Sequence, residues 1–391
     1  MESSILTTTT GNQSEGFSLY IHVPFCKRKC GYCHFYVLKP NASNISLFLN
    51  NLKKEMKLHL PSFQGQTLKS LYLGGGTPSL LDEASLKQLF SDLKQYVNFA
   101  PETTEITLEM NPETGKSWDF TKLVNLGVNR LSLGVQSFDS NLLTLLERDH
   151  TTSDVEIVCN KALKAGLTNI SCDLMYEVPN QSLELWKDTL QTLTKFPFTH
   201  LSLYNLTIEP NTSFYKRREE LTKSICSLQE QREMYCYAKE FLENEGWWQY
   251  EISAFAKQGL FSQHNTGYWH GRNFIGLGPS AFSYLHPKRF QNTPNLLKWG
   301  KFLKEEKTPV SFEEILPQKE KRRELLAIAL RLLEGVRLDY FEEKWGKLSS
   351  QDHQNIHLLK RQGLLKSPTT NKLSLTYEGI LHYDTVASEL I

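Results

Sequence analysis

The chain has 391 residues, enough for two or three domains with a full hydrophobic core. Hydrophobic residues make up 40% of it and charged residues 22%, with a formal net charge of +1, so no excess charge favours nucleic acid or an anionic membrane. The seven cysteines form no even framework, and we find neither a long apolar span nor a signal-peptide pattern. We therefore expect a cytoplasmic protein with no nucleic-acid partner and no stable membrane insertion.

Residues 1–16 are polar and rich in Thr and Ser, which predicts a disordered N-terminal tail. After this tail, six apolar runs of strand length recur, separated by amphipathic stretches. They cover residues 17–23, 69–74, 104–110, 130–136, 169–178 and 199–207.

The stretches between these runs are typical of helices. The capping-box pairs Ser153–Glu156 and Ser227–Glu230 predict two helix starts. Six alternating strand and helix units indicate a parallel sheet covered by helices, and six units, not eight, favour an open barrel. The predicted fold class is α/β, a partial (β/α)6 barrel over residues 17–250.

Beyond residue 250 the pattern changes. Residues 251–300 form a Gly-, His- and aromatic-rich connecting segment, and residues 301–391 are predicted to form a smaller C-terminal domain. An amphipathic helix at 318–334 and two apolar runs around a turn within 362–376 favour a helical, winged-helix-like unit. Its run KEKRRE mixes charge signs, so we expect it to face solvent, and we expect the unit to pack or to form a lid.

Three cysteines, Cys26, Cys30 and Cys33, lie in the run CKRKCGYC directly after the first strand. Three thiolates at this spacing can hold three irons of a [4Fe–4S] cluster and leave the fourth iron open. A disulfide would leave an odd cysteine and suit an oxidising compartment. A zinc site would need a fourth ligand, which His22 or His34 could supply. The spacing favours the cluster.

Polar groups and glycines follow the other predicted strands, at the end of a barrel where chemistry usually lies. Two of them, Glu109 and Asp173, are acids on apolar strands. A buried carboxylate needs a partner, which is either a cationic ligand or a lysine or arginine of the barrel. Arg148 could bind a carboxylate ligand or form a surface salt bridge. Tyr20 either faces the same end of the barrel or packs in the core.

The wider sequence resembles the radical S-adenosylmethionine (SAM) superfamily and, within it, the oxygen-independent coproporphyrinogen III oxidase group. From residue 18 onward the chain carries, in order, YIHVPFCKRKCGYCHF, YLGGGTPSLL, EMNPET, RLSLGVQSFD, CDLMYEVPNQ, LYNLTIEP and HNTGYW. The resemblance implies that Cys26, Cys30 and Cys33 bind a [4Fe–4S] cluster that takes electrons from a donor. It implies contacts to SAM from Tyr20, Gly75, Gly76, Thr77, Glu109, Gln136, Arg148 and Asp173.

The group has two branches. The oxidases carry a further cysteine two residues after the third cluster cysteine, where this chain has Phe35, and they have a longer N-terminal extension. The HemW-type heme chaperones have phenylalanine there and an HNxxYW segment. That segment is matched here by His264, Asn265, Tyr268 and Trp269, which the resemblance implies contact heme. The alternative for His264 is a loop histidine satisfied by the backbone.

The sequence therefore predicts a HemW-type chaperone that binds the cluster, SAM and heme and transfers heme to an unidentified acceptor protein. Gating of the transfer by cluster state or SAM is a hypothesis. The alternatives are a coproporphyrinogen III oxidase, a radical enzyme that modifies heme, and a nucleic-acid-modifying enzyme, so whether the protein is an enzyme stays open. Two departures from the chaperone pattern are His34, where aspartate is usual, and Glu177-Val178, where glycine-leucine is usual.

Overall fold

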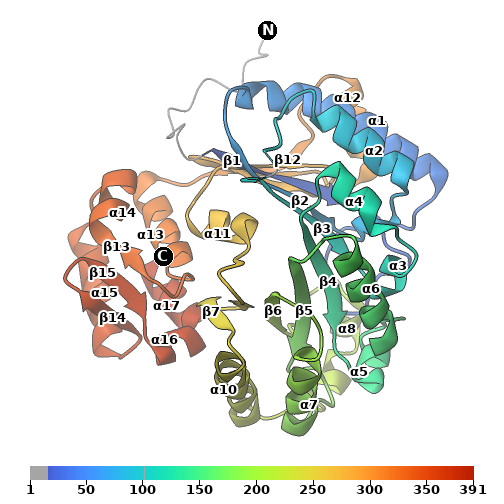
Figure 1. Cartoon of the computed structure of the whole chain (residues 1–391). Coiled ribbons are helices and arrows are strands. Elements are labelled where there is room, and N and C mark those ends of the chain that lie inside the picture. The colour runs from blue at the N-terminus through green and yellow to red at the C-terminus, as the bar shows by residue number, and fades with distance from the viewer. Residues whose placement is uncertain (1–15, 101) are drawn as a thin grey trace.

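A computed structural model describes residues 16–100 and 102–391, so the predicted tail lies outside the described residues except for Gly16. Twelve strands form one curved sheet in the order β12-β11-β10-β9-β1-β2-β3-β4-β5-β6-β8-β7. Figure 1 shows the helices that follow β2 to β6 along the outer side of this sheet, and α11 with the C-terminal unit on the other side.

The six predicted strands all form and run parallel in sequence order. They are β1 (Phe17–Val23), β2 (Leu68–Gly75), β3 (Glu105–Met110), β4 (Arg130–Gln136), β5 (Ile170–Tyr176) and β6 (His200–Asn205). Their Leu, Ile and Val side chains are buried together in the largest hydrophobic cluster of the described residues. The predicted (β/α)6 arrangement is therefore confirmed. It could be predicted because strands that are buried on both faces have sequences that are short apolar runs.

Helices separate these strands. They are α1 (Ala42–His59), α2 (Glu83–Leu93), α3 (Pro112–Gly115), α4 (Phe120–Leu126), α5 (Ser140–Leu145), α6 (Thr152–Lys164), α7 (Leu183–Leu193), α8 (Ser213–Lys216), α9 (Arg218–Thr222) and α10 (Leu228–Asn244), with short 3-10 helices η2 (Leu60–Phe63) and η3 (Pro78–Leu80). The capping box at Ser227 and Glu230 is confirmed. The other prediction was wrong by two residues: the hydroxyl of Thr151 and the carboxylate of Asp154 cap α6.

The sheet does not end near residue 250. The predicted connecting segment supplies β8 (Ala254–Ala256), α11 (Gln263–Trp269), β9 (Phe274–Leu277), β10 (Phe282–Leu285) and β11 (Lys288–Asn292), after β7 (Trp248–Glu251). Strand β9 pairs parallel to β1, so this segment continues the sheet on the side of β1. Helix α12 (Leu296–Lys304) and β12 (Val310–Ile315) complete it. The proposed boundary at residue 301 therefore falls within the sheet, because long-range pairing with β1 and β11 has no local signal.

The C-terminal unit has its own hydrophobic cluster. It contains α13 (Gln318–Ala329), β13 (Val336–Arg337), α14 (Leu338–Trp345), α15 (Ser350–Arg361), β14 (Leu365–Thr369), β15 (Lys372–Leu375), α16 (Tyr377–Leu381) and α17 (Tyr383–Leu390). Its strands form the antiparallel order β13-β15-β14, the helix and hairpin arrangement expected of a winged-helix-like unit. We expected the run KEKRRE, residues 319–324, to face solvent. Its two arginines instead pair with the buried Asp352, Arg322 at 2.9 Å and Arg323 at 2.6 Å.

None of the helices in the described part of the chain is long and apolar enough to cross a membrane.

Candidate functional site

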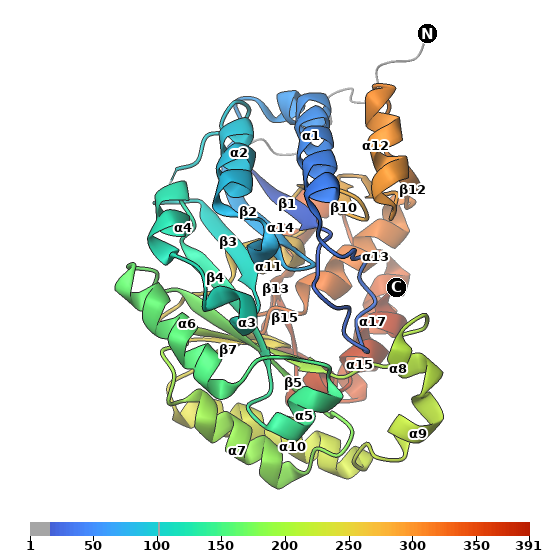
Figure 2. The same cartoon turned by 90° about the vertical axis from the view of Figure 1, so that its right-hand side faces the viewer.

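The three loop cysteines lie between β1 and α1, beside the carboxyl ends of the strands. Figure 2 shows this loop, in dark blue, running from α1 toward α8, where the Phe214 amide donates to the Gly31 carbonyl at 2.8 Å. All three thiols are partly buried and none is in a disulfide. Burial raises the pKa of the Cys26 thiol to about 11. Burial also raises the pKa of the Cys33 thiol, so a metal that binds Cys26 or Cys33 must displace a proton, and cluster ligation is coupled to proton release.

Two neighbouring side chains are aimed at these sulfurs. The Thr77 hydroxyl lies 3.4 Å from Cys26 Sγ, and Arg148 Nη1 lies 3.9 Å from Cys30 Sγ. A hydroxyl and a guanidinium are groups that stabilise thiolate charge and tune a cluster. In residues 16–100 and 102–391 no three His, Cys, Asp or Glu side chains are gathered as for a single metal ion. Both ring nitrogens of His22 are already engaged. Its Nδ1 lies 3.0 Å from the Tyr20 hydroxyl, and its Nε2 lies 3.0 Å from the Tyr36 carbonyl.

The GGGT turn after β2 packs directly on the cysteine loop. The amide of Gly76 donates to Val23 and that of Thr77 to Phe25, at 2.9 and 2.7 Å. A Cβ on Gly76 would lie 2.5 Å from the Phe25 carbonyl oxygen, so only glycine permits this approach. These amides, which we expected to face a ligand, therefore serve to dock the turn against the loop.

The two strand acids lie inside the barrel. Glu109 accepts hydrogen bonds from the Tyr72 hydroxyl at 2.8 Å and the Gly75 amide at 3.0 Å. Asp173 accepts from the Ser132 hydroxyl at 3.3 Å. Burial raises the pKa of Glu109 to about 7 and that of Asp173 to about 6. Neither acid forms an ion pair within 4.0 Å in the described part of the chain. The buried Arg130 guanidinium lowers the pKa of both acids from a greater distance but does not offset their burial, so a cationic ligand would supply a direct partner.

The other predicted site residues converge on the same end. Arg148 donates to the Asn111 side chain at 2.8 Å and to the Gly134 carbonyl at 2.7 Å, so its hydrogen-bond partners are neutral groups and a cysteine sulfur, not a surface carboxylate. Gln136 ends β4 with a φ of 67°. A non-glycine residue in this left-handed region is strained and is often found at functional sites. The Tyr20 hydroxyl is directed at His22.

A cavity of about 530 Å³ lies between the end of the cysteine loop, the β9–β11 side of the sheet and α13. This volume is within the range of about 300–1,000 Å³ typical of cofactor and ligand pockets. Its wall is mainly aromatic, and the aromatic members are Tyr20, Phe35, Tyr36, Tyr268, Trp269, Phe274, Phe282 and Tyr284. Two guanidinium groups, Arg272 and Arg289, also line it, and Arg289 is ion-paired with Glu314 and with Glu324, which lines the cavity as well. The cavity therefore suits a large, flat, apolar molecule that carries anionic groups.

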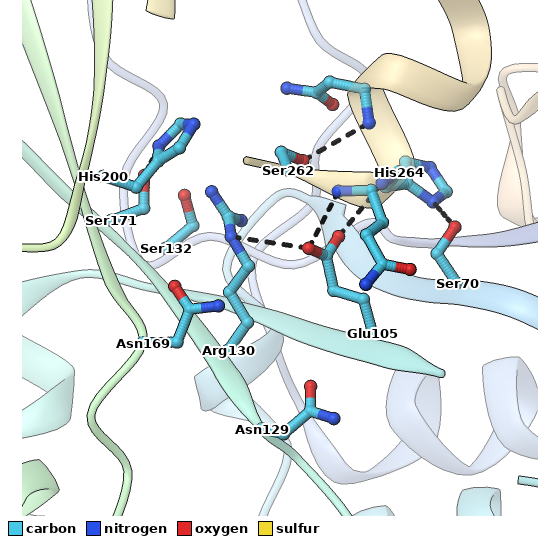
Figure 3. Close-up of polar contacts among 12 residues, drawn as sticks. Ser70, Glu105, Asn129, Arg130, Ser132, Asn169, Ser171, His200, Ser262 and His264 are labelled. Atoms are coloured by element: carbon cyan, nitrogen blue, oxygen red, sulfur yellow. Dashed lines mark hydrogen bonds and ion pairs between the residues drawn. The ribbon is translucent and has the colours of Figure 1, made fainter. Parts of the chain in front are cut away.

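The HNxxYW segment forms α11, between the sheet and this cavity. The His264 ring is buried, with Nδ1 2.8 Å from the Ser70 hydroxyl and Nε2 2.7 Å from the Tyr268 hydroxyl. Figure 3 shows the ring directed at Ser70, with the Glu105 carboxylate beneath the first turn of α11. That carboxylate accepts from the Gln263 and His264 amides at 2.9 and 3.0 Å. His264 is thus satisfied by side chains, not by the backbone, and no ring nitrogen is open to iron in this conformation.

The remaining residues of the segment take different positions. Tyr268 and Trp269 line the cavity, and the Arg331 guanidinium lies 4.4 Å from the Trp269 ring centre. The Ser262 hydroxyl caps α11 by accepting from the backbone amide of Asn265 at 3.3 Å. Of the four residues predicted to contact heme, the structure therefore brings two to the cavity wall.

Sequence reasoning missed several residues of this site. Each of them forms a hydrogen bond that orients a predicted site residue. Tyr72 bonds Glu109, His22 bonds Tyr20, and Asn111 bonds Arg148. Strand alternation was a usable signal, since Tyr20 and His22 are two residues apart and must share a face.

Glu177, where the family pattern has glycine, follows β5 with a φ of 60°. Burial also raises the pKa of its carboxyl. We expect Glu177→Gly to raise the free energy of unfolding by about 1 kcal/mol relative to Glu177→Ala, because glycine adopts this φ without strain. Urea denaturation of both variants measures the difference. Equal stability of the two would contradict the strain argument.

Comparisons with known proteins agree with this architecture. Residues 20–193 match the family model of the radical SAM superfamily, and residues 316–382 match that of the HemN C-terminal domain. The heme chaperone HemW of Bacillus subtilis is 32% identical over 365 residues, covering 93% of this chain and 96% of that protein. The heme chaperone HemW of Buchnera aphidicola subsp. Schizaphis graminum is 34% identical, covering 90% of this chain and 92% of the relative.

The chain belongs to the HemW family. The zebrafish mitochondrial radical S-adenosyl methionine domain-containing protein 1 is also 32% identical, over 83% of this chain and 75% of that protein. The coproporphyrinogen III oxidase HemN of Escherichia coli superposes with a TM-score of 0.84 at 22% identity, covering 97% of this chain and 91% of that one. At this identity the likeness shows that the HemW family member has the HemN fold, and nothing about its reaction. Membership of the radical SAM superfamily implies a [4Fe–4S] cluster and SAM as cofactors.

Proposed function

We propose that this protein is a heme chaperone that holds a [4Fe–4S] cluster and SAM and transfers heme to an acceptor protein. The observation that carries the proposal is the aromatic cavity of about 530 Å³, which begins at the end of the cysteine loop in a chain whose relatives are named heme chaperones. Phe35 lines this cavity at the position where the oxidases carry a further cysteine.

In this proposal the cluster is held by Cys26, Cys30 and Cys33. Their fit rests on three thiols without a disulfide, beside a hydroxyl and a guanidinium. When bound, the cluster and SAM supply one-electron chemistry. An electron donor for the cluster belongs to the same proposal.

SAM would occupy the barrel end beside the cysteine loop. Glu109 and Asp173 lie there as buried carboxylates without a directly paired cation, which fits a ligand with an ammonium group and two ribose hydroxyls. Arg148 holds the turn of Asn111 and would complement the SAM carboxylate. The full proposed set is Tyr20, Gly75, Gly76, Thr77, Glu109, Gln136, Arg148 and Asp173.

Heme would be the cargo, held in the cavity between aromatic rings. Porphyrin faces stack on such rings, and a propionate would pair with Arg272 along the wall, whereas Arg289 is already ion-paired with Glu314 and Glu324. Because α13 forms part of the wall, movement of the C-terminal unit relative to the sheet would open the cavity for transfer.

An anaerobic comparison of two activities tests the proposal. The reconstituted protein is first given SAM, reductant and coproporphyrinogen III, and the products are separated by chromatography. It is then titrated with ferric heme, and heme loss to apomyoglobin is timed with and without SAM and reductant. We expect stoichiometric heme binding and no protoporphyrinogen. Repeated turnover would identify an oxidase instead, and a release rate unaffected by SAM or reduction would overturn the gating hypothesis.

A further inference from the structure

Heme iron requires an axial ligand. Among the described residues, His22 and His34 line the cavity, and His264 and His286 lie behind its wall, each bonded to the hydroxyl of a wall tyrosine, at 2.7 and 3.2 Å. His22 lines it, but one ring nitrogen is bonded to the Tyr20 hydroxyl and the other to the Tyr36 carbonyl, both at 3.0 Å. His264 lies behind the wall, with both nitrogens bonded to hydroxyls. Each of these rings would have to lose a buried hydrogen bond to bind iron, at a cost of about 1–3 kcal/mol.

His34 differs from both. It lines the cavity and is exposed to solvent, and its ring stacks on Phe35 with 4.6 Å between ring centres. Within residues 16–100 and 102–391 its ring nitrogens have no hydrogen-bond partner, and the ring forms no ion pair. An open imidazole on an aromatic wall can ligate iron without breaking any contact of the fold.

The oxygen donors of the wall are poorer candidates. Burial raises the pKa of Tyr20, Tyr268 and Tyr284, so their phenolate forms, which ligate ferric iron, are disfavoured. The hydroxyl of Tyr268 is also held by His264.

We propose that His34 is the axial ligand of heme iron in this cavity and that the HNxxYW histidine positions Tyr268 against the wall. The inference rests on the proposed function, because it names the iron ligand of the same heme site. It assigns a role to a residue at which this chain departs from the chaperone pattern. His264 then acts through Tyr268, which it holds at 2.7 Å, and touches no iron.

The arrangement links the heme site to the cysteine loop. His34 directly follows Cys33, and consecutive Cα atoms are about 3.8 Å apart. A cluster bound to Cys33 would therefore also restrict the position of His34, the proposed heme ligand. By linkage, each ligand should then favour the binding of the other.

Heme titration of the cluster-reconstituted full chain tests the assignment. Ferric heme is added to wild type, His34→Ala, His34→Tyr, His264→Gln and the exposed surface control His357→Ala, and binding is followed by optical and electron paramagnetic resonance spectra. We expect an imidazole-ligated spectrum in wild type, His357→Ala and His264→Gln. Since outer partners of a metal site alone are worth about 10–100-fold in affinity, His34→Ala should lower heme affinity at least about tenfold.

His34→Tyr supplies the decisive signature, because a structural role could not convert the spectrum to that of phenolate-ligated, high-spin ferric heme. Wild-type spectra in both His34 variants, or loss of the imidazole signature in His264→Gln alone, would overturn the assignment. If wild type binds no heme at all, it is the proposed function that fails, so the two failures are distinguishable.

Discussion

Alanine at Cys30 is expected to abolish the [4Fe–4S] cluster, reducing bound iron from about four per chain to nearly none. Two remaining thiolates cannot hold a cube whose fourth iron already lacks a protein ligand. The loss should be complete because the groups beside the sulfurs, the neutral Thr77 hydroxyl and the cationic Arg148 guanidinium, cannot replace a thiolate. Iron and acid-labile sulfide after anaerobic reconstitution measure the effect.

The matched control is Cys236→Ala, which removes a partly exposed cysteine of α10 outside the loop. This variant should retain wild-type iron and sulfide. A stoichiometric cluster in Cys30→Ala, or the same loss in the control, would contradict the assignment of the three loop cysteines.

Glu109→Gln is expected to weaken SAM binding by about 100-fold, roughly 2.7 kcal/mol, because it removes the charge of one partner of a buried ion pair. The same change should stabilise the unliganded protein at neutral pH by about 1–3 kcal/mol, because a buried carboxylate without a cation is costly there. Weaker SAM binding together with a more stable unliganded protein distinguishes a ligand-binding acid from a structural one, whose loss would lower the stability. Calorimetric titration with SAM and thermal unfolding measure the two effects.

The pH dependence follows from the same burial, which raises the pKa of Glu109 from 4.5 to about 7. As pH falls from 7 toward 4.5, the folded unliganded protein takes up a proton that the unfolded chain does not, so its free energy of unfolding rises. SAM affinity should change the other way, falling by up to about tenfold per pH unit below 7, since the charged carboxylate binds the cation. Glu109→Gln should flatten both profiles between pH 7 and 6, and the slope that remains below pH 6 belongs to Asp173, whose pKa is raised from 3.8 to about 6.

Glu102→Gln, an exposed acid before β3, is the control for both measurements and should match wild type. Unchanged SAM affinity in Glu109→Gln would remove this acid from the proposed site.

Much of the architecture was predictable because its signals are local. Each barrel strand is a short apolar run, and β1 was predicted to the residue at Phe17–Val23. The hairpin of β14 and β15 surrounds a turn that is readable from its own sequence. The cysteine spacing is local as well. The continuation of the sheet beyond residue 250 was not predictable, since β9 pairs with β1 and the partners are distant in sequence.

The sequence by itself determined the alternation of strands and helices along the barrel, the family motifs, and which residue types lie at the strand ends. Only the tertiary structure decided what each polar group faces. His264 looked like an iron ligand, yet Ser70, 194 residues away, occupies one of its nitrogens. His34 was considered as a metal ligand of the cysteine loop, yet it lies on a cavity whose walls come from β1, β10 and α13. The physical reason is that periodicity reports burial, whereas a buried histidine's hydrogen-bond partners come from whichever strands and helices the fold brings beside it.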